Sequence, residues 1–417
     1  MQLERAGDRA LLLSMGSQQP YGYAVTARWL DGRGRWQDSD HIVGDLEDFP
    51  DLGVATDETG NAVVAWIEPG PFALYREHEI WARRYVAGEG WTEPEYVGDA
   101  GIAGQVGPKA TFRSNGTPVV VWGRRYREGD EPSGYAISEH TDARGWGPPS
   151  VISASDNVHS RSLAGLGTDG EGGVLAIWSV YERDGSDIDR LATLRATQWS
   201  PETGWGDDSS LRDRRAWKWS HVIVDSEGTA WVFSRYATEG GCPTAVRYVA
   251  GQWEDAVDFA VGCEDGFEFG TLAVDNAGGA IAIWTERGED DPAAFFSRYN
   301  PGDGWLSASP MPLGDGVLVP TYAVTARAGG DVLALWYRAT SAEDGFRLST
   351  WASQLRDDGL WTEPERLASR GPLFQIGIAP HLTSFEDGRA VGVWWRYDGV
   401  EVPYLRWEMT PWTSHYR

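Results

Sequence analysis

Cysteine is almost absent from this chain of 417 residues, which contains only Cys242 and Cys263. Two thiols are too few for a zinc site built from four cysteines. Long apolar runs are also missing, because no stretch of about 18 apolar residues occurs that could cross a membrane as a helix. The sequence therefore predicts neither a cysteine-rich metal domain nor a membrane-spanning protein.

Positive charge is scarce as well, since 36 Lys and Arg residues stand against 62 Asp and Glu residues and the formal net charge is −26. Proteins that bind DNA, RNA or anionic membranes neutralise phosphates with Lys and Arg. We therefore expect no nucleic-acid partner and no membrane partner. An acidic surface also keeps an aromatic-rich protein soluble, so the charge alone implies no ligand.

The motifs of the common cofactor and hydrolase sites are missing. The chain contains no GxSxG, no P-loop, no HExxH and no dinucleotide-binding glycine fingerprint. The segment DGSDID at 184–189 lacks the spacing and the final Glu of an EF-hand loop. We expect no cofactor and no resident metal. No helical period of useful length occurs either, which argues against an α/β fold.

What the chain does contain is a recurring phrase of glycine, an apolar run and tryptophan. It is clearest in GNAVVAW, from Gly60 to Trp66, and the copies end 51 to 58 residues apart. The later copies end at Trp122, Trp178, Phe233, Trp284, Trp336 and Trp394, and a degenerate first copy ends at Met15. A fixed period of this size indicates an array of small repeated units.

Each unit contains four strand-like segments. In the second unit they are 51–56, the run after Gly60, 79–85 and the segment that starts at Trp91. Gly60 permits the positive φ that a tight hairpin turn requires. Four antiparallel strands per unit predict an all-β fold, a single β-propeller domain over residues 1–417. We prefer eight blades, with 379–417 as the last, and seven blades plus an irregular terminal unit are the alternative.

A second tryptophan follows each third strand-like segment. These residues are Trp36, Trp91, Trp146, Trp205, Trp253, Trp305 and Trp361. Large aromatic side chains at repeated positions are expected to fill the space between blades rather than to stack on a ligand.

Polar residues stand where the first strands begin, on the face where propeller loops usually carry function. They are Asp51, Lys109, Ser162, His221, Thr271, Thr321 and His381. These positions differ from unit to unit, which favours one specialised site over several identical ones. We interpret His221 and His381 as candidate general acids or bases, with a metal-ligand role or simple hydrogen bonding in a channel as alternatives. Asp51 and Lys109 are candidate substrate contacts.

A second set of polar residues follows the second strands. It comprises Arg125 with Tyr126, Arg235 with Tyr236, Arg338, Arg396 with Tyr397, Glu68 and Glu286. Arginine binds carboxylate, sulfate or phosphate in bidentate fashion, although a rim ion pair is the alternative role. The tyrosines could stack on a sugar ring or transfer a proton, and Glu68 and Glu286 could form the carboxylate pair of a glycosidase.

The two cysteines fall on loops that share one face of a propeller. Cys242 lies between the second and third strands of its unit, and Cys263 lies in the connection to the next unit. A Cys242–Cys263 disulfide is therefore compatible with the fold and would suit an oxidising compartment. Two unpaired thiols are the alternative.

The phrase D-x-x-G-N-A-x-x-x-W at 57–66, echoed at 225–233 and 275–284, resembles the repeat of bacterial sialidase-like (BNR-type) propeller proteins. The resemblance covers nearly the whole chain and implies the propeller fold. True sialidases carry S-x-D-x-G-x-x-W boxes with an arginine triad and a Tyr–Glu pair. This sequence has no such box, so the resemblance assigns no catalytic role to any residue here.

Our leading hypothesis is a carbohydrate-active protein that binds an acidic glycan at a channel mouth, as a polysaccharide lyase or glycoside hydrolase. A lectin-like or protein-binding propeller is the alternative, and a biosynthetic enzyme for a small aromatic or apolar molecule is the second. We expect a monomer with a glycan or small-molecule ligand. No signal peptide is visible, but the short first strand suggests a removed leader, so we expect a secreted or extracytoplasmic protein, with a cytoplasmic one as alternative.

Overall fold

The recurring phrases form strands throughout the computed structural model. The structure describes residues 2–17, 22–46, 51–69, 78–101, 107–124, 134–152, 161–169, 171–181, 191–200, 202–211, 216–217, 221–235, 242–259, 267–287, 291–327, 330–342, 345–356, 358–372, 379–385, 387–396 and 408–409. All regular elements in this part of the chain are strands. The helix-free pattern expected from the sequence is therefore observed.

Seven sheets each contain four strands in chain order. The first is β1 (Gln2–Ala6), β2 (Arg9–Ser17), β3 (Tyr23–Leu30) and β4 (Asp40–Leu46). The second is β5 (Leu52–Thr56), β6 (Ala62–Pro69), β7 (His78–Val86) and β8 (Gly90–Trp91), with β9 (Glu95–Gly101) on β7. The third is β10 (Lys109–Phe112), β11 (Pro118–Arg124), β12 (Gly134–Thr141) and β13 (Gly145–Trp146), with β14 (Ser150–Ile152) on β12.

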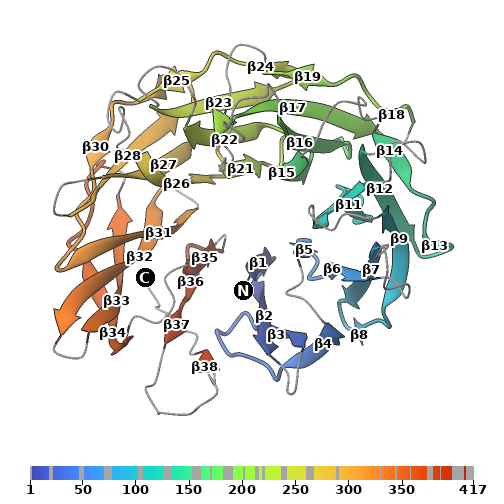
Figure 1. The fold of residues 1–417 in the computed structure, drawn as a ribbon, viewed down its shortest axis with the longest axis horizontal. Helices are drawn as coiled ribbons and strands as arrows, with labels where there is room; N and C mark the ends of the chain where they lie inside the picture. The colour runs from blue at the N-terminus through green and yellow to red at the C-terminus, as the bar shows by residue number, and fades with distance from the viewer. Residues whose placement is uncertain are drawn as a thin grey trace. The chain divides into compact units, whose positions relative to one another are not determined.

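The remaining four sheets repeat this order (Figure 1). The fourth is β15 (Arg161–Thr168), β16 (Val174–Tyr181), β17 (Leu191–Ser200) and β18 (Gly204–Trp205), with β19 (Ser209–Ser210) and β20 (Ala216–Trp217). The fifth is β21 (His221–Val224), β22 (Ala230–Arg235), β23 (Pro243–Val249) and β24 (Gln252–Trp253), with β25 (Val257–Asp258). The sixth is β26 (Phe267–Val274), β27 (Ala280–Glu286), β28 (Ala293–Asn300) and β29 (Gly304–Trp305), with β30 (Ser309–Pro310), and the seventh is β31 (Val317–Ala326), β32 (Val332–Ala342), β33 (Gly345–Leu355) and β34 (Glu365–Pro372).

The elements are those of an all-β propeller with seven four-stranded antiparallel blades, and the preference for eight blades is not supported. The described residues after 379 form only two two-stranded sheets, β35 (His381–Ser384) with β36 (Ala390–Val393) and β37 (Trp395–Arg396) with β38 (Glu408–Met409). Trp394 still packs against Leu335 and Tyr337 of the seventh sheet. Among the described residues, the last copy of the phrase therefore keeps its packing residue but belongs only to two-stranded sheets, which matches the seven-blade alternative.

Contacts divide the chain into two compact units, Met1–Trp231 with Arg247–Asp255, and Val232–Val246 with Ala256–Arg417. Within the first unit the first strands lie side by side in the order β1, β5, β10, β15 and β21 (Figure 1). Within the second unit β26 lies beside β31, and β31 lies beside β35. Within the first unit, side chains of neighbouring first strands can therefore line a common pocket.

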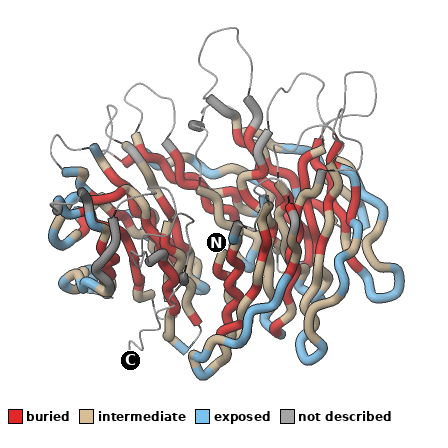
Figure 2. Tube along the Cα trace, turned by 60° about the horizontal axis from the view of Figure 1, so that its bottom comes forward, coloured by how far each residue is buried: buried red, intermediate tan, exposed pale blue. Residues whose placement is uncertain are grey.

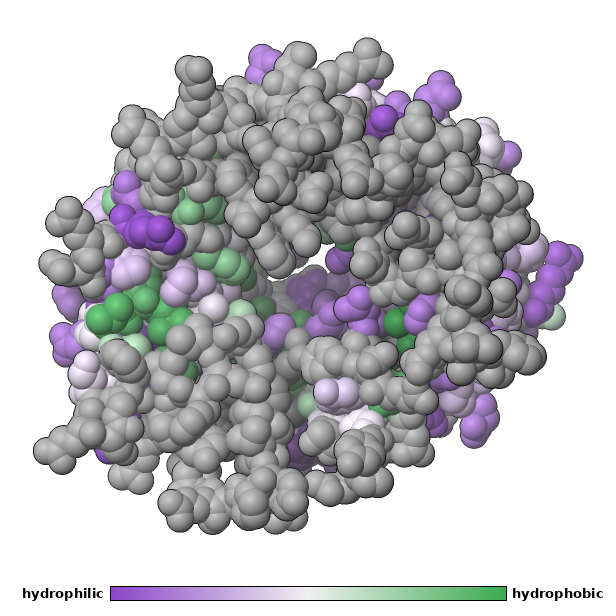
Figure 3. Space-filling view, viewed as in Figure 1, coloured by the Kyte–Doolittle hydropathy of each residue, from purple (hydrophilic) through white to green (hydrophobic). Residues whose placement is uncertain are grey.

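The second strands are buried on both faces, because neighbouring sheets pack against each side. Trp66 of β6 packs with Leu11 and Trp29 of the first sheet, while Val63 of β6 packs with Trp122 of the third. Figure 2 shows buried residues along the strands and exposed residues in the turns. Among the residues coloured in Figure 3, hydrophilic ones lie at the right edge, and hydrophobic ones gather at the left. Double-sided burial explains why the apolar runs are nearly continuous.

The turn between first and second strands is held by an aspartate. The Asp57 carboxylate accepts hydrogen bonds from the backbone N–H groups of Thr59 and Asn61, at 2.9 Å each. Gly60 has φ of 90°, which confirms the glycine requirement expected from the sequence. Asp169, Asp225 and Asp275 accept the same pair of backbone bonds in their own turns. The D-x-x-G phrase therefore has a structural role.

The second tryptophans pair with the ends of the third strands. Trp91 lies across from Tyr85, and Trp253 lies across from Tyr248, with ring centroids 5.4 Å and 5.0 Å apart. Both contacts are edge-to-face, a favourable arrangement for aromatic rings. Each of these two contacts lies within one sheet, and Trp91 also packs against the apolar cluster that contains Leu11 and Trp29 of the first sheet, as expected for a residue between blades.

First strands approach so closely that glycine is required at Gly53. A Cβ there would lie 2.7 Å from the Pro108 carbonyl oxygen and 2.9 Å from Lys109 Cα, both backbone atoms. Gly16 of β2 provides a control, because an added Cβ would meet nothing within 4 Å.

We expect Gly53→Ala to lower the free energy of unfolding by about 1–3 kcal/mol, the usual cost of overpacking a tight site. Gly16→Ala should change it by less than about 0.5 kcal/mol. Urea denaturation of both variants measures the difference. Equal stability of the two variants would show that β5 and β10 are not in close contact.

Candidate functional site

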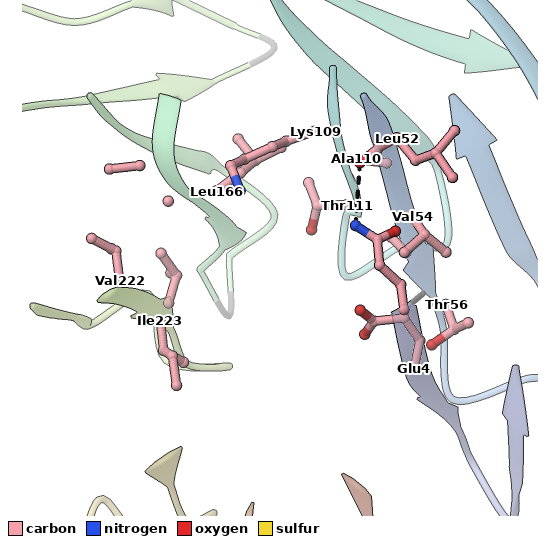
Figure 4. A pocket seen from close by; sticks show the side chains of 16 residues that line it. Glu4, Leu52, Val54, Thr56, Lys109, Ala110, Thr111, Leu166, Val222 and Ile223 are labelled. Carbon is pink, nitrogen blue, oxygen red and sulfur yellow. Dashed lines mark hydrogen bonds between the residues drawn. The ribbon is translucent and has the colours of Figure 1, made fainter. Parts of the chain in front are cut away.

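A pocket of about 440 Å³ opens among the first strands of the first unit. Five strands, β1, β5, β10, β15 and β21, contribute its walls. Figure 4 shows Glu4 and Lys109 extending into the space between these strands, with Val222 and Ile223 across from Glu4. Most of the lining residues are apolar by type, but the surface that the pocket exposes is mainly polar and includes the charged groups of Glu4 and Lys109.

Glu4 occupies a position that is apolar in the next three sheets. Glu4 pairs with Leu11 of β2. The last pair before the hairpin turn is Ala6 with Arg9, so Glu4 lies two residues before the end of β1. The same register position holds Val54, Ala110 and Leu166 in β5, β10 and β15. A single carboxyl group therefore replaces a hydrocarbon side chain in this layer of the pocket.

Burial makes the Glu4 carboxyl an unusually weak acid. The pKa of Glu4 is raised from 4.5 to about 7 by loss of hydration, and the positive charge of Lys109 opposes this rise. A carboxyl group with a pKa near neutrality can both give and take a proton under physiological conditions. Glu4 is therefore a candidate general acid.

Lys109 extends into the pocket from the start of β10 and is one of only two lysines in the sequence. It forms no hydrogen bond and no ion pair within 4 Å with any residue that the structure describes. Burial lowers the pKa of Lys109, while the charges of Glu4 and Asp51 oppose the change. A cation without a paired carboxylate is available to an anionic ligand.

Two predicted residues flank this pair. His221 begins β21, directly before three residues that line the pocket, and burial together with the charge of Lys109 lowers its pKa to about 4. It is therefore a neutral imidazole, and so a potential base, at neutral pH. Asp51 is exposed ahead of β5, packs against Gly107 and accepts a hydrogen bond from the Gly107 N–H.

The polar residues predicted at the starts of the first strands do not share one register. Lys109, Thr271 and His381 each pair with the residue that precedes the second-strand tryptophan. Gly53 holds that position in β5, so Asp51 lies two residues outside it. Gly165 and Ala323 hold it in β15 and β31, so Ser162 and Thr321 lie three and two residues before it. The expected seven-membered ring is therefore wrong for Asp51, Ser162 and Thr321.

Residues after the second strands have separate roles. Arg338 is 3% exposed and its Nη2 donates to Asp291 Oδ2 at 3.0 Å, which favours a structural ion pair over the predicted contact with substrate. Glu68 accepts a hydrogen bond from Trp66 Nε1 at 2.6 Å, and Glu286 ends β27. Glu68 and Glu286 belong to different compact units.

The other predicted residues are less informative. Arg235 ends β22 and Arg396 ends β37, and only their backbone is described. Arg125, Tyr126, Tyr236, Tyr397 and Cys263 lie outside the described residues. Cys242 precedes β23 and is disulfide-bonded. His381 begins β35, and burial lowers its pKa to about 4.

Within the described ranges no group of three His, Cys, Asp or Glu side chains is placed to hold a metal ion. No helix in the same ranges is long and apolar enough to cross a membrane.

The sequence singled out Lys109, which lines the pocket, and His221, which directly precedes lining residues, but not Glu4. The β1–β2 turn contains only Gly7 and Asp8 between its closing residues, whereas the β5–β6 turn contains five residues. Alignment on the turn makes Leu13, rather than Met15, the equivalent of Trp66. An acid in the middle of the first strand, where other units have apolar residues, is the signal that would have revealed Glu4.

No family model and no curated protein sequence matches the chain. A Hadza microbial sialidase, Hz136, is 13% identical over 75% of this chain and 71% of its own, with a TM-score of 0.41. The β-propeller domain of the trilobed protease from Pyrococcus furiosus is 10% identical over 89% and 98%, with a TM-score of 0.48. A polysaccharide lyase, PL25 ulvan lyase, is 9% identical over 84% and 91%, also with a TM-score of 0.48. Sialidases and polysaccharide lyases are thus among the solved propellers that resemble this chain.

The raised pKa of Glu4 predicts a pH-dependent stability. Between pH 4.5 and 7 the folded state holds the Glu4 proton more tightly than the unfolded state does, so this stabilisation is lost as pH rises through about 7. Over this pH range the free energy of unfolding of the wild type should fall by roughly 2–3 kcal/mol relative to that of Glu4→Gln. Denaturation of both proteins from pH 4 to 8 measures it. Glu58→Gln removes an exposed carboxylate paired with Arg5 but keeps Glu4, so it should show the same loss of stability with pH as the wild type.

Proposed function

We propose that this protein is a carbohydrate-active enzyme that binds an anionic saccharide in the pocket between β1, β5, β10, β15 and β21 and cleaves it by elimination. The observation that supports this most strongly is the presence, in one pocket, of a lysine without an ion-pair partner among the described residues and a carboxyl group with a pKa of about 7. Groups whose pKa values are pushed away from their usual range mark acid–base sites.

Lys109 is assigned to the acidic group of the substrate. Its ammonium would contact the carboxylate of a uronate residue and stabilise the negative charge that develops there when the neighbouring carbon loses its proton. Because Lys109 is partly removed from water, such a contact is stronger than the same contact in water. Neutral saccharides lack this contact and are expected to bind weakly.

His221 and Glu4 are assigned to proton transfer. His221 takes the proton from the carbon next to the carboxylate, and the electron pair forms the new carbon–carbon double bond. The carbon–oxygen bond to the next sugar breaks, and Glu4 donates its proton to the departing oxygen. The products are an unsaturated uronate and a free hydroxyl, and a proton returns from His221 to Glu4 through solvent.

From the sequence alone, we propose that Arg125, Arg235 and Arg396, with the tyrosines beside them, bind acidic groups of a ligand. We also propose a monomeric, extracytoplasmic enzyme, since polysaccharides are met outside the cell.

The test is incubation with neutral, uronate-rich and sulfated polysaccharides, followed by mass spectrometry. We expect unsaturated products from the uronate-rich substrates, with a rate that is highest between limbs near pH 4 and pH 7, because His221 must be neutral and Glu4 protonated. Lys109→Met and His221→Gln should each lower the rate roughly 10²- to 10⁴-fold.

Glu58→Gln serves as the control and should keep the wild-type rate. Shortened products without a new double bond would show that the enzyme hydrolyses the polysaccharide and would contradict elimination. Intact polysaccharides that nevertheless bind would favour the lectin-like alternative, and cleavage confined to neutral substrates would contradict the proposal.

A further inference from the structure

Glu4 of β1 and Lys109 of β10 line the same pocket from the two strands that flank β5, and the charge of each acts on the other (Figure 4). We propose that the pocket binds one monoanionic group of a saccharide as the counter-ion of Lys109, and that Glu4 takes up a proton as this group binds. The inference rests on the proposed anionic-saccharide site, but it concerns binding and does not depend on turnover.

The charges of the pocket motivate this coupling. Lys109 is the only Lys or Arg among the residues that line it, and Glu4 is the only acid. A second anion in the same 440 Å³ would lie close to the ionised Glu4 carboxylate, and like charges in a partly apolar site repel strongly. Protonation of Glu4 removes this repulsion, and the ammonium group of Lys109 can then pair with the anionic ligand.

Two other titratable groups near Lys109 are less suited to take the proton. Partial burial raises the pKa of Asp51, but this residue is exposed ahead of β5, and the Gly107 N–H and the charge of Lys109 oppose the rise. His221 on β21 feels the positive charge of Lys109, which disfavours its protonated form. Residues Ala10 to Leu13 of β2, which pair with β1, have apolar side chains. Residues 163–167 of β15 carry no polar side chain either. Glu4, with a pKa of about 7, therefore changes its charge most readily.

The consequence is an affinity that depends on pH. At pH 5.5 Glu4 is already protonated in the free protein, so an anion binds without proton uptake. At pH 8 Glu4 is mostly ionised, so binding should take up about one proton and affinity should fall roughly tenfold for each pH unit above 7. The pocket would thus accept acidic sugars best under mildly acidic conditions.

Isothermal titration calorimetry with D-glucuronate tests this, with D-glucose as the neutral control. Titrations at pH 8 in two buffers of different ionisation enthalpy give the number of protons taken up. We expect about one proton at pH 8, close to none at pH 5.5, and no heat from glucose. Binding without proton uptake at pH 8, or no binding up to about 50 mM, would overturn the inference.

Four variants locate the proton and the charge. Glu4→Gln should bind glucuronate without proton uptake at either pH and about tenfold more tightly than wild type at pH 8. Glu58→Gln should keep the wild-type uptake, and so should His221→Gln. Lys109→Met should lose binding, and peptide mapping after amine labelling should show glucuronate protecting Lys109, one of two lysines in the chain.

Uptake that disappears in His221→Gln but persists in Glu4→Gln would also overturn the inference. The proposed elimination is judged separately from its products. Proton-linked binding with intact polysaccharides would contradict that reaction alone, and unsaturated products with pH-independent binding would contradict this inference alone.

Discussion

The close approach of neighbouring first strands is the constraint on which the pocket depends. Gly53 of β5 leaves no space for a Cβ against Pro108 and Lys109, and Gly165 of β15 leaves none against Val222. Second strands behind them are buried on both faces, and tryptophans such as Trp66 fix the spacing of the sheets. Glu4 and Lys109, which extend from inner strands into the space between neighbouring strands, lose part of their hydration there. That is why a glutamate and a lysine in this layer have displaced pKa values.

The fold was largely predictable, because its signals are local and repeated. The phrase at Gly60–Trp66 contains a turn glycine with positive φ and an apolar run that needs burial on two sides, and both requirements are visible in the sequence. The blade number was less predictable. The copy that ends at Trp394 has the packing residue of a blade, but the formation of outer strands depends on pairing partners, and tryptophan spacing does not report them. Repeated core residues therefore predict where the core packs more reliably than they predict the number of complete four-stranded sheets.

The site was predictable only in part, because its residues depend on strand register. Lys109 and His221 stood out as polar residues at the starts of strands. Glu4 did not, because the β1–β2 turn is three residues shorter than the β5–β6 turn and shifts the first unit relative to the others. Ser162 and Thr321 were misaligned as well, because Gly165 and Ala323 hold the register position of Lys109 in their strands. A difference of a few residues in register therefore decides which side chain enters a pocket.

The use of lysine at position 109 is itself informative in a chain whose 36 basic residues include only one other lysine. Arginine serves the peripheral ion pairs, such as Arg247 with Glu254, where a planar fork meets a carboxylate in water. A guanidinium in the pocket would stay charged under all conditions and would hold Glu4 ionised beside it. An ammonium is more compact, and burial shifts its pKa together with that of its neighbour. Replacement of Lys109 by arginine should therefore retain anion binding while the pKa of Glu4 falls, which separates the need for a positive charge from the need for a titratable pair.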